Sequence, residues 1–298
     1  MQGLAAAPDL LVEQGLERVL AAAGRARGID LSGTGFVDPY GMIGVLAAGR
    51  IMGAAGPRPA LVLSPKRPVA SYLERMDFFR HAAGIFELRP PLRDGAPRRR
   101  RSADVLLEIT GIEASADIHR IAERVMERAE AILVRHLRYD RKAIHGFVAA
   151  LSEVCQNILE HSGGGGWVGI QRYFFGGRLQ RSVVKIAVMD TGIGLAETLR
   201  PRHAARMGGK WSDLAAIRAA LFQGLSRFDD PGRGQGLPAV RRFAELWQGR
   251  LSLRSGTARA SLIPKWSFGK PVETGLPYFP GTQVQLVLPA ADEPAIES

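Results

Sequence analysis

The sequence has a single cysteine, Cys155, among 298 residues, which excludes an internal disulfide framework and any zinc site built from several cysteines. It also lacks an apolar run long enough to cross a bilayer as a helix. No secretory signal is evident, because Asp9, Glu13 and Glu17 interrupt the apolar residues near the N-terminus. An amphipathic helix is expected at 9–24 instead. These absences predict a cytoplasmic protein without a membrane segment.

Acidic residues are too few to balance the basic ones: 29 Asp and Glu stand against 40 Lys and Arg, for a formal net charge of +11. Part of the excess is concentrated at 93–102, RDGAPRRRRS. A basic balance favours partners that carry phosphate or acidic groups. Nucleic acid is therefore one candidate partner, although the chain has no zinc-finger or aromatic ribonucleoprotein signature. The alternative is an arginine-rich solvated surface.

The pattern of expected elements divides the chain into two regions joined by a linker. Residues 1–92 alternate strand and helix signals, which is typical of an α/β unit. The Pro, Gly and Arg-rich segment 93–102 indicates an exposed linker. Residues 103–298 predict an α+β unit, with helices over a mostly antiparallel sheet. Its expected helices are 115–137, 140–161, 212–224 and 237–248, and its expected strands are 104–112, 167–175, 182–190, 250–255, 258–264 and 282–289.

The segment LSEVCQNILEHS (151–162) predicts a helix with two distinct faces. Apolar residues of the segment recur at helical spacing and indicate a buried stripe. Glu153, Asn157 and His161 follow one another at intervals of four, so they share another face. This face could simply meet water, but Asn is a mediocre helix former, because its amide competes for backbone hydrogen bonds.

Two glycine-containing turns follow. In VMDTGIGL (188–195), an apolar strand ends on Asp190, and Gly192 and Gly194 come directly after it. Glycine lets a ligand approach the backbone closely, and a carboxylate there could accept a hydrogen bond from an exocyclic amine such as that of adenine. The alternative is an ordinary strand-to-helix turn.

In PGRGQGLPAV (231–240), Gly232, Gly234 and Gly236 alternate directly before an expected helix. Backbone N–H groups at a helix N-terminus favour anions, so this loop could receive phosphate, with Arg233 as a further contact. A flexible linker with a solvated arginine is the alternative. In PGTQVQLVLP (280–289), a Gly-Thr step containing Thr282 enters the last strand.

In order and spacing, these four segments resemble the Bergerat-fold ATPases of the GHKL superfamily, which contains gyrase, Hsp90-type chaperones, histidine kinases and MutL. The resemblance covers about residues 103–289 and implies ATP and Mg²⁺ as ligands. It implies that Asn157 helps to hold Mg²⁺, that Glu153 is the general base and that His161 lies near the phosphates. Asp190, supported by Thr282 and a water, would accept from the adenine amine.

The same resemblance implies a lid over the nucleotide. Gly232, Gly234 and Gly236 would lie in this lid, with their amides facing the phosphates. The long segment 196–235 would form it and would stay mobile until ATP orders it.

The sequence SEVCQNILEHS is most similar to the corresponding segment of the anti-sigma-factor serine kinases. Residues 1–92 weakly resemble a STAS domain, the type of antagonist that those kinases phosphorylate. At the place of the usual phosphoacceptor turn, the chain reads Asp38-Pro39-Tyr40-Gly41-Met42 without a serine. We therefore expect this region to bind rather than to receive phosphate, unless it is a generic α/β unit that only shares a turn.

The resulting hypothesis is an ATP-binding regulatory protein, an ATPase or serine/threonine kinase whose partner is a sigma-like factor or a STAS-type protein. A histidine kinase is disfavoured, because His119 and His136 lack a phosphoacceptor context. The alternatives are a non-catalytic nucleotide-gated scaffold and a nucleic-acid-associated GHKL ATPase. A homodimer is compatible with the resemblance.

Overall fold

The computed structural model describes residues 3–54, 56–91, 104–129, 133–134, 137–161, 165–176, 179–207, 209–227 and 234–291. The expected linker at 93–102 lies outside these residues. Gly232 and Arg233 of the glycine-containing loop also lie outside them, and so does the side chain of His161.

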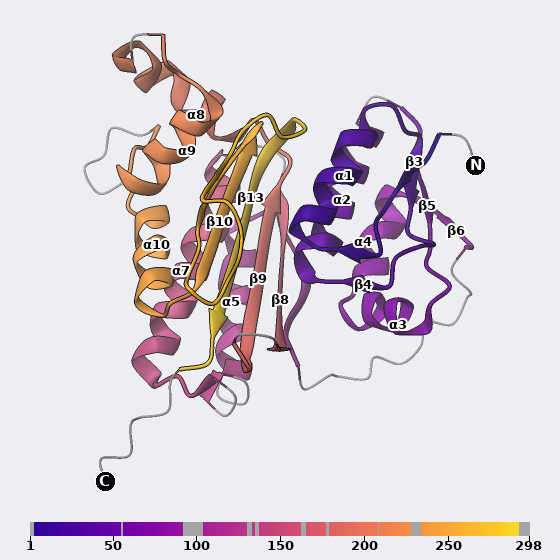
Figure 1. Cartoon of the computed structure of the whole chain (residues 1–298), viewed down its shortest axis with the longest axis horizontal. Coiled ribbons are helices and arrows are strands. Elements are labelled where there is room, and N and C mark those ends of the chain that lie inside the picture. The colour runs from indigo at the N-terminus through magenta and orange to yellow at the C-terminus, as the bar shows by residue number, and fades with distance from the viewer. Residues whose placement is uncertain are drawn as a thin grey trace.

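A seven-stranded sheet forms the middle layer of the molecule, in the order β12-β11-β10-β13-β9-β8-β7 (Figure 1). Every neighbouring pair is antiparallel, as expected for the second region. The strands are β7 (Val105–Ile112), β8 (Gly166–Phe175), β9 (Arg181–Asp190), β10 (Arg250–Gly256), β11 (Ala258–Leu262), β12 (Val272–Glu273) and β13 (Phe279–Pro289).

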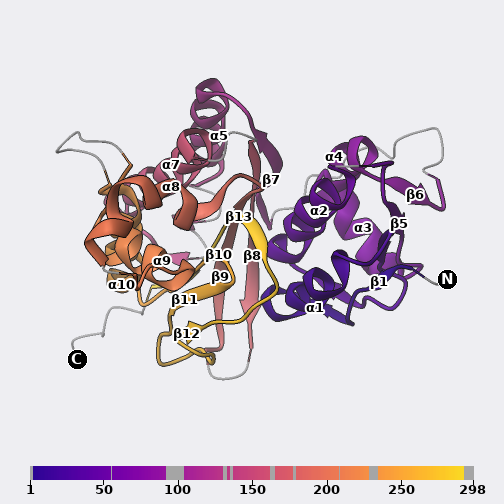
Figure 2. The ribbon, with the colours of Figure 1, turned by 90° about the horizontal axis from the view of Figure 1, so that it is seen from above.

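Helices cover one face of this sheet, as Figure 2 shows from above. They are α5 (Ser115–Ala129), α7 (Arg141–His161), α8 (Gly194–His203), α9 (Asp213–Phe222) and α10 (Gly236–Leu246), and a 3-10 turn, η2 (Ala204–Met207), follows α8. The expected apolar stripe of α7 is confirmed, because Phe147, Leu151, Val154 and Ile158 are all buried in the core between the helices and the sheet.

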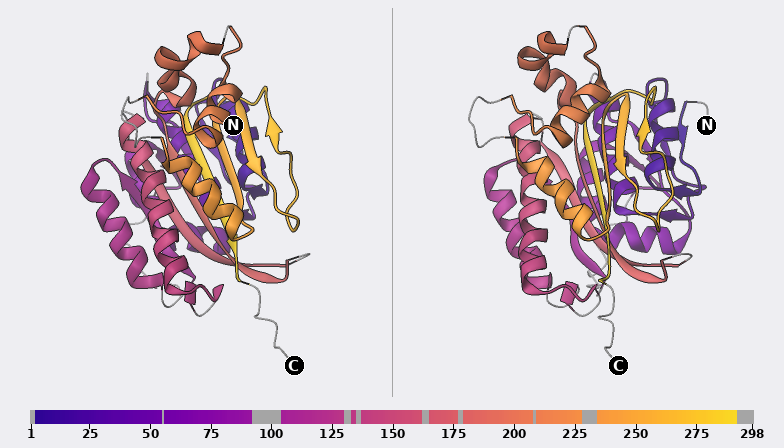
Figure 3. Two further views of the ribbon diagram at one scale, coloured as in Figure 1. Left: turned by 90° about the vertical axis from the view of Figure 1, so that its left-hand side faces the viewer. Right: turned by 60° about the vertical axis from the view of Figure 1, so that its left-hand side comes forward.

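The N-terminal unit, residues 3–54 and 56–91, packs on the opposite face of the sheet (Figures 1 and 3). A four-stranded parallel sheet, β1-β3-β5-β6, confirms an α/β arrangement here. Its elements are β1 (Ala5–Ala6), β2 (Leu10–Leu11), α1 (Glu13–Ala23), β3 (Gly28–Asp30), β4 (Phe36–Val37), α2 (Pro39–Gly53), β5 (Ala60–Val62), α3 (Arg67–Arg75), α4 (Phe78–Ile85) and β6 (Glu87–Arg89).

Several expected boundaries were wrong. The helix expected at 9–24 begins at Glu13, because Leu10 and Leu11 pair with β4. The sequence VASYLERMDFFRHA (69–82), which carries one continuous helical pattern, forms parts of two helices, which separate where Asp77 adopts a left-handed φ of 60°. The segment directly after Asp190, where no helix was expected before residue 212, opens with α8.

A second hydrophobic core joins the N-terminal unit to the sheet. Met42 and Ile43 of α2 belong to the same buried cluster as Trp167, Met189 and Phe279 of the large sheet. The two units therefore share one apolar interior.

The turn that resembles a phosphoacceptor site is held in this interface. Asp38 is fully buried, accepts a hydrogen bond from the Gly41 N–H (2.9 Å) and pairs with Lys185 of β9 (3.2 Å). Tyr40 is also buried, and its hydroxyl donates to Gln283 of β13. Burial raises the pKa of the Tyr40 hydroxyl, so it stays protonated. The turn is therefore a structural contact on the sheet.

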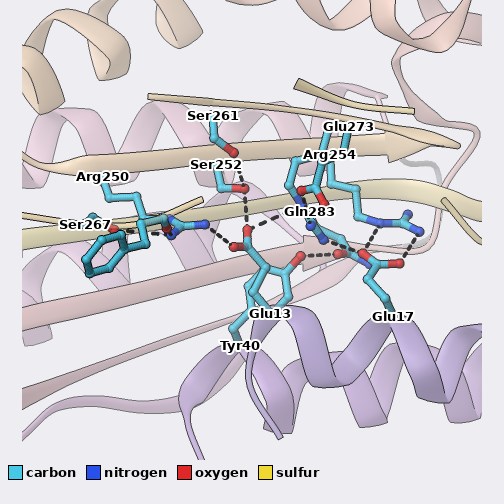
Figure 4. Close-up of polar contacts among 12 residues, drawn as sticks. Glu13, Glu17, Tyr40, Arg250, Ser252, Arg254, Ser261, Ser267, Glu273 and Gln283 are labelled. Carbon is cyan, nitrogen blue, oxygen red and sulfur yellow. Dashed lines mark hydrogen bonds and ion pairs between the residues drawn. The ribbon is translucent and has the colours of Figure 1, made fainter. Parts of the chain in front are cut away.

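A buried ionic cluster, defined here as Glu13, Glu17, Arg250, Arg254 and Arg259, fastens α1 to the sheet (Figure 4). The side chains of Arg254 and Arg259 are 0% and 2% exposed. Burying a guanidinium without a carboxylate partner would be costly. The arginines of β10 and β11 therefore depend on the glutamates of α1, together with Glu273 of β12 in the case of Arg259.

Candidate functional site

The polar face of α7 lines a cavity of about 340 Å³, which we call the main pocket. Glu153 and Asn157, one helical turn apart, both line it, together with Gly234 and Gly236 at the start of α10. Residues of α8, including Thr198 and Leu199, complete the wall. The helix face and the glycine-containing loop that the sequence singled out thus meet in one place.

Asp190 ends β9 and faces a smaller cavity of about 20 Å³, which we call the inner pocket. Thr282, Asn157 and Asp190 all line the inner pocket. The Gly192 N–H donates to Asp190 Oδ1 at 2.8 Å. Burial raises the pKa of Asp190 to about 7, while hydrogen bonds from the backbone N–H groups of Gly192 and Thr282 act in the opposite direction.

Asn157 connects the two pockets, because it lines both. Its Nδ2 atom is buried and has no hydrogen-bond partner among the described residues. A buried polar atom of this kind is costly unless it binds something, so a ligand with an acceptor atom fits here. The amide oxygen is a suitable ligand for Mg²⁺, which prefers oxygen donors and commonly retains waters and substrate phosphates.

The described residues contain no group of three or more His, Cys, Asp or Glu side chains arranged to hold a metal ion. A cation in the main pocket would therefore depend on Asn157 together with oxygens of a bound phosphate. This donor set matches the way in which Mg²⁺ is usually held, through a few protein oxygens plus phosphates.

Glycines allow close backbone approaches around the inner pocket. Gly194 has a φ of +75° at the start of α8, and a Cβ there would lie 2.8 Å from Ser255 Oγ. A Cβ on Gly281 would lie 2.1 Å from the carbonyl oxygen of Asp190. A side chain at Gly194 would push against Ser255 of β10, and a side chain at Gly281 would displace the end of β9, so these glycines help to fix where Asp190 lies.

The start of α10 is equally tight. A Cβ on Gly236 would lie 2.4 Å from Glu153 Oε2, so only glycine lets the carboxylate lie this close to the helix N-terminus. Gly234 has a φ of +87°, and a Cβ there would lie 1.9 Å from the carbonyl oxygen of Gly224. The two ends of the loop between α9 and α10 therefore meet beside the main pocket.

The sequence missed several residues of the main pocket. Gln156 and Glu160 line it and hydrogen-bond each other at 3.0 Å. Their polar character and spacing of four on α7 could have revealed them. Thr198 and Ser226 also line it; they lie within the segment 196–235 that was expected to form the lid, but nothing in that segment singled them out.

Comparison with known proteins identifies one family. The family described as "Histidine kinase-, DNA gyrase B-, and HSP90-like ATPase" matches residues 143–292, which is just over half of the chain. The matched range begins in α7, ends just after β13 and includes both pockets. No curated protein matches the chain. Among the described residues, no helix is long and apolar enough to cross a membrane.

Proposed function

The chain belongs to the family of histidine kinase-, DNA gyrase B- and HSP90-like ATPases, and from this premise we propose that it hydrolyses ATP or transfers its terminal phosphoryl group to a protein hydroxyl. The observation that carries the proposal is the position of Asn157, which lines both the pocket that contains Glu153 and Gly236 and the pocket that contains Asp190 and Thr282. Phosphates would lie in the main pocket, and the adenine amine would reach Asp190 at the inner pocket, which holds only about 20 Å³ and would have to widen around the base.

Asp190 and Thr282 would recognise the base. The exocyclic amine of adenine can donate to the buried carboxylate, which favours the ionised form of Asp190. A hydrogen-bonding group in a buried site also discriminates strongly against ligands that lack the matching donor. The inner pocket would therefore select adenine.

Asn157 and Glu153 would act at the phosphates. Mg²⁺ held through Asn157 would offset the phosphate charge. Glu153 would accept the proton of the attacking water or hydroxyl as a general base, and its place on α7 beside the main pocket supports this role. The amides next to Gly234 and Gly236 would face the phosphates.

The acceptor hydroxyl would come from a separate protein. The Tyr40 hydroxyl is buried against Gln283, on the sheet face opposite the helices that line the main pocket. By resemblance to the anti-sigma-factor kinases, the partner would be a sigma-like factor or a STAS-type protein. The N-terminal unit would be a fixed binding element rather than a substrate.

The test measures ADP formation with ATP and Mg²⁺ for wild type, Glu153→Gln and Asp190→Ala. Glu153→Gln should keep ATP affinity but lose turnover by about a hundredfold or more, as expected for removal of a general base. Asp190→Ala should lose ATP binding. Glu245→Gln, which alters an exposed carboxylate of α10 paired with Arg241, is the matched control and should behave as wild type.

Each outcome has a definite meaning. Wild-type turnover in Glu153→Gln would remove the general-base role. Wild-type ATP affinity in Asp190→Ala would remove the adenine assignment. ATP binding without turnover in the wild type, tested with and without a hydroxyl-bearing partner, would leave a nucleotide-gated scaffold.

A further inference from the structure

A third cavity, of about 540 Å³, lies where the N-terminal unit meets β7 and β8. Helices α2 and α4 form one side, and Gly111 and Trp167 of the large sheet lie on the other. We call this cavity the basic cleft. The charged, polar and aromatic side chains that line it are Arg50, Arg58, Arg80, His81, Glu113 and Trp167. None of them belongs to the main or inner pocket.

The arginines are held in place from different elements. The guanidinium carbon of Arg50 lies 3.8 Å from the centroid of the Trp167 ring, a cation–π contact. Arg58 Nη1 donates to the carbonyl oxygen of Ala83 at 2.9 Å, which ties the loop before β5 to α4. Arg80 lies 3.6 Å from Asp77, and its side chain is 74% exposed. Guanidinium groups suit phosphate, because their planar N–H edges match its oxygens in pairs.

The charge of the cleft favours an anion. Among the described residues, three arginines line it, against Glu113 as the single carboxylate of the lining. Burial lowers the pKa of Arg50, and the negative charge of Glu113 opposes this effect. A further anion in the cleft would act in the same direction as Glu113 and stabilise the charged guanidinium.

The remaining polar groups favour hydroxyls on the ligand. His81 Nε2 lies 3.0 Å from the carbonyl oxygen of Ile109, so this nitrogen carries the hydrogen and donates. Burial lowers the pKa of His81, so the ring is neutral at pH 7 and Nδ1 is an acceptor. Glu113 is likewise an acceptor. Acceptors beside a cluster of arginines match a molecule that has both phosphate and hydroxyl groups.

The basic cleft lies across the sheet from the inner pocket. Trp167 pairs with Met189, and Asp190 is the next residue of β9. Because side chains alternate between the two faces of a strand, Met189 faces the N-terminal unit while Asp190 faces the helices. The cleft and the inner pocket are therefore separate sites at the same end of one sheet.

We propose that the basic cleft binds a small hydroxylated phosphate ester, such as a sugar phosphate. Its phosphate lies among Arg50, Arg58 and Arg80, and its hydroxyls donate to Glu113 and His81. A cavity of this volume is of the size that small-molecule sites have. The proposal is independent of ATP turnover.

The test is isothermal titration calorimetry on the full chain, without Mg²⁺, using ribose 5-phosphate, inorganic phosphate and ribose. We expect ribose 5-phosphate to bind, inorganic phosphate to bind more weakly and ribose not to bind. Arg58→Gln and Arg80→Gln should each weaken ribose 5-phosphate binding about tenfold or more, because each removes a charged hydrogen bond.

The matched control is Arg89→Gln, which removes an exposed arginine paired with Glu87 outside the cleft lining. It should bind ribose 5-phosphate as wild type does. Asp190→Asn should also bind it normally, since it alters only the inner pocket. Thermal unfolding midpoints close to the wild-type value would show that the variants are folded.

Four results would overturn the proposal. The first is no binding of ribose 5-phosphate, and the second is binding that Asp190→Asn abolishes while the arginine variants retain it. The third is equal affinity for inorganic phosphate, which would assign a free-phosphate site. The fourth is competition by a short DNA duplex that binds more tightly with the same arginine dependence, which would assign a nucleic-acid surface.

Discussion

The buried carboxyl of Asp190 should make the stability of the protein depend on pH in a definite direction. Burial raises its pKa from an ordinary value of 3.8 to about 7. Between these values the folded protein holds a proton that the unfolded chain releases, so the free energy of unfolding falls as pH rises from about 4 to about 7. At about 1.4 kcal/mol for each pKa unit, the full loss is about 4 kcal/mol.

Urea unfolding of wild type and Asp190→Asn at pH 5 and pH 8 measures this term. Asn keeps the shape and an acceptor for the Gly192 N–H but does not titrate. Other titrating groups are common to both proteins, so they cancel in the difference. We expect the variant to gain about 2–3 kcal/mol relative to wild type between pH 5 and pH 8, because about two pKa units of the shift lie above pH 5.

The reasoning fails if the two proteins show the same pH dependence, or if the variant loses stability relative to wild type as pH rises. A ligand test checks the same carboxyl. An amine that donates to Asp190 favours its ionised form, so ATP binding at pH 7, where about half of the carboxyl is protonated, should release about half a proton per site. Calorimetric titrations in two buffers of different ionisation enthalpy would detect that proton.

Three further predictions concern packing. Gly236→Ala places a methyl group 2.4 Å from Glu153 Oε2, so ADP formation should fall about tenfold or more through displacement of the carboxylate, and an unchanged rate would contradict this geometry. Glu17→Gln leaves the buried Arg254 undercompensated and should lower the free energy of unfolding in urea by about 3–5 kcal/mol, whereas a loss below 1 kcal/mol would show that water reaches the cluster. Burial raises the pKa of Cys155 to about 12, so Ellman's reagent at pH 8 should modify it only after unfolding; rapid reaction of the folded protein would disprove this burial.

Local periodicity was sufficient to predict the helix that carries the site. The apolar stripe of α7 fixes which of its faces is buried, and this alone places Glu153 and Asn157 together on the side that lines the main pocket. The end of β9 could be predicted in the same way, because an apolar strand that stops at Asp190 must present that carboxyl where the strand leaves the sheet. The roles given to these residues in nucleotide binding remain predictions.

Other elements were hidden because their signals are not local. β1, β2 and β4 are two residues long, too short for alternation to be recognised. Helix α8 contains Pro201, which weakens the helical pattern there.

The contacts between the two units were the feature that the sequence predicted least. Glu13 and Glu17 look like the solvated face of an amphipathic helix, yet their partners include Arg250 and Arg254 on the large sheet. Nothing near α1 in the sequence indicates these arginines. The turn at Asp38 resembles a phosphoacceptor turn in sequence, but its pairing with Lys185 of β9, inside an interface, could not be read from the sequence.

The order of the strands has a consequence for how the protein is made. Strand β13 lies in the middle of the large sheet, between β10 and β9, yet the ribosome produces it after every other described strand of that sheet. Until β13 emerges, no strand connects β9 to β10. The hydroxyl of Tyr40 also lacks its hydrogen-bond acceptor, Gln283. Arg250, the ion-pair partner of Glu13, is synthesised 237 residues after it. Folding is therefore completed late, and the growing chain exposes unpaired strand edges and apolar helix faces that chaperones recognise.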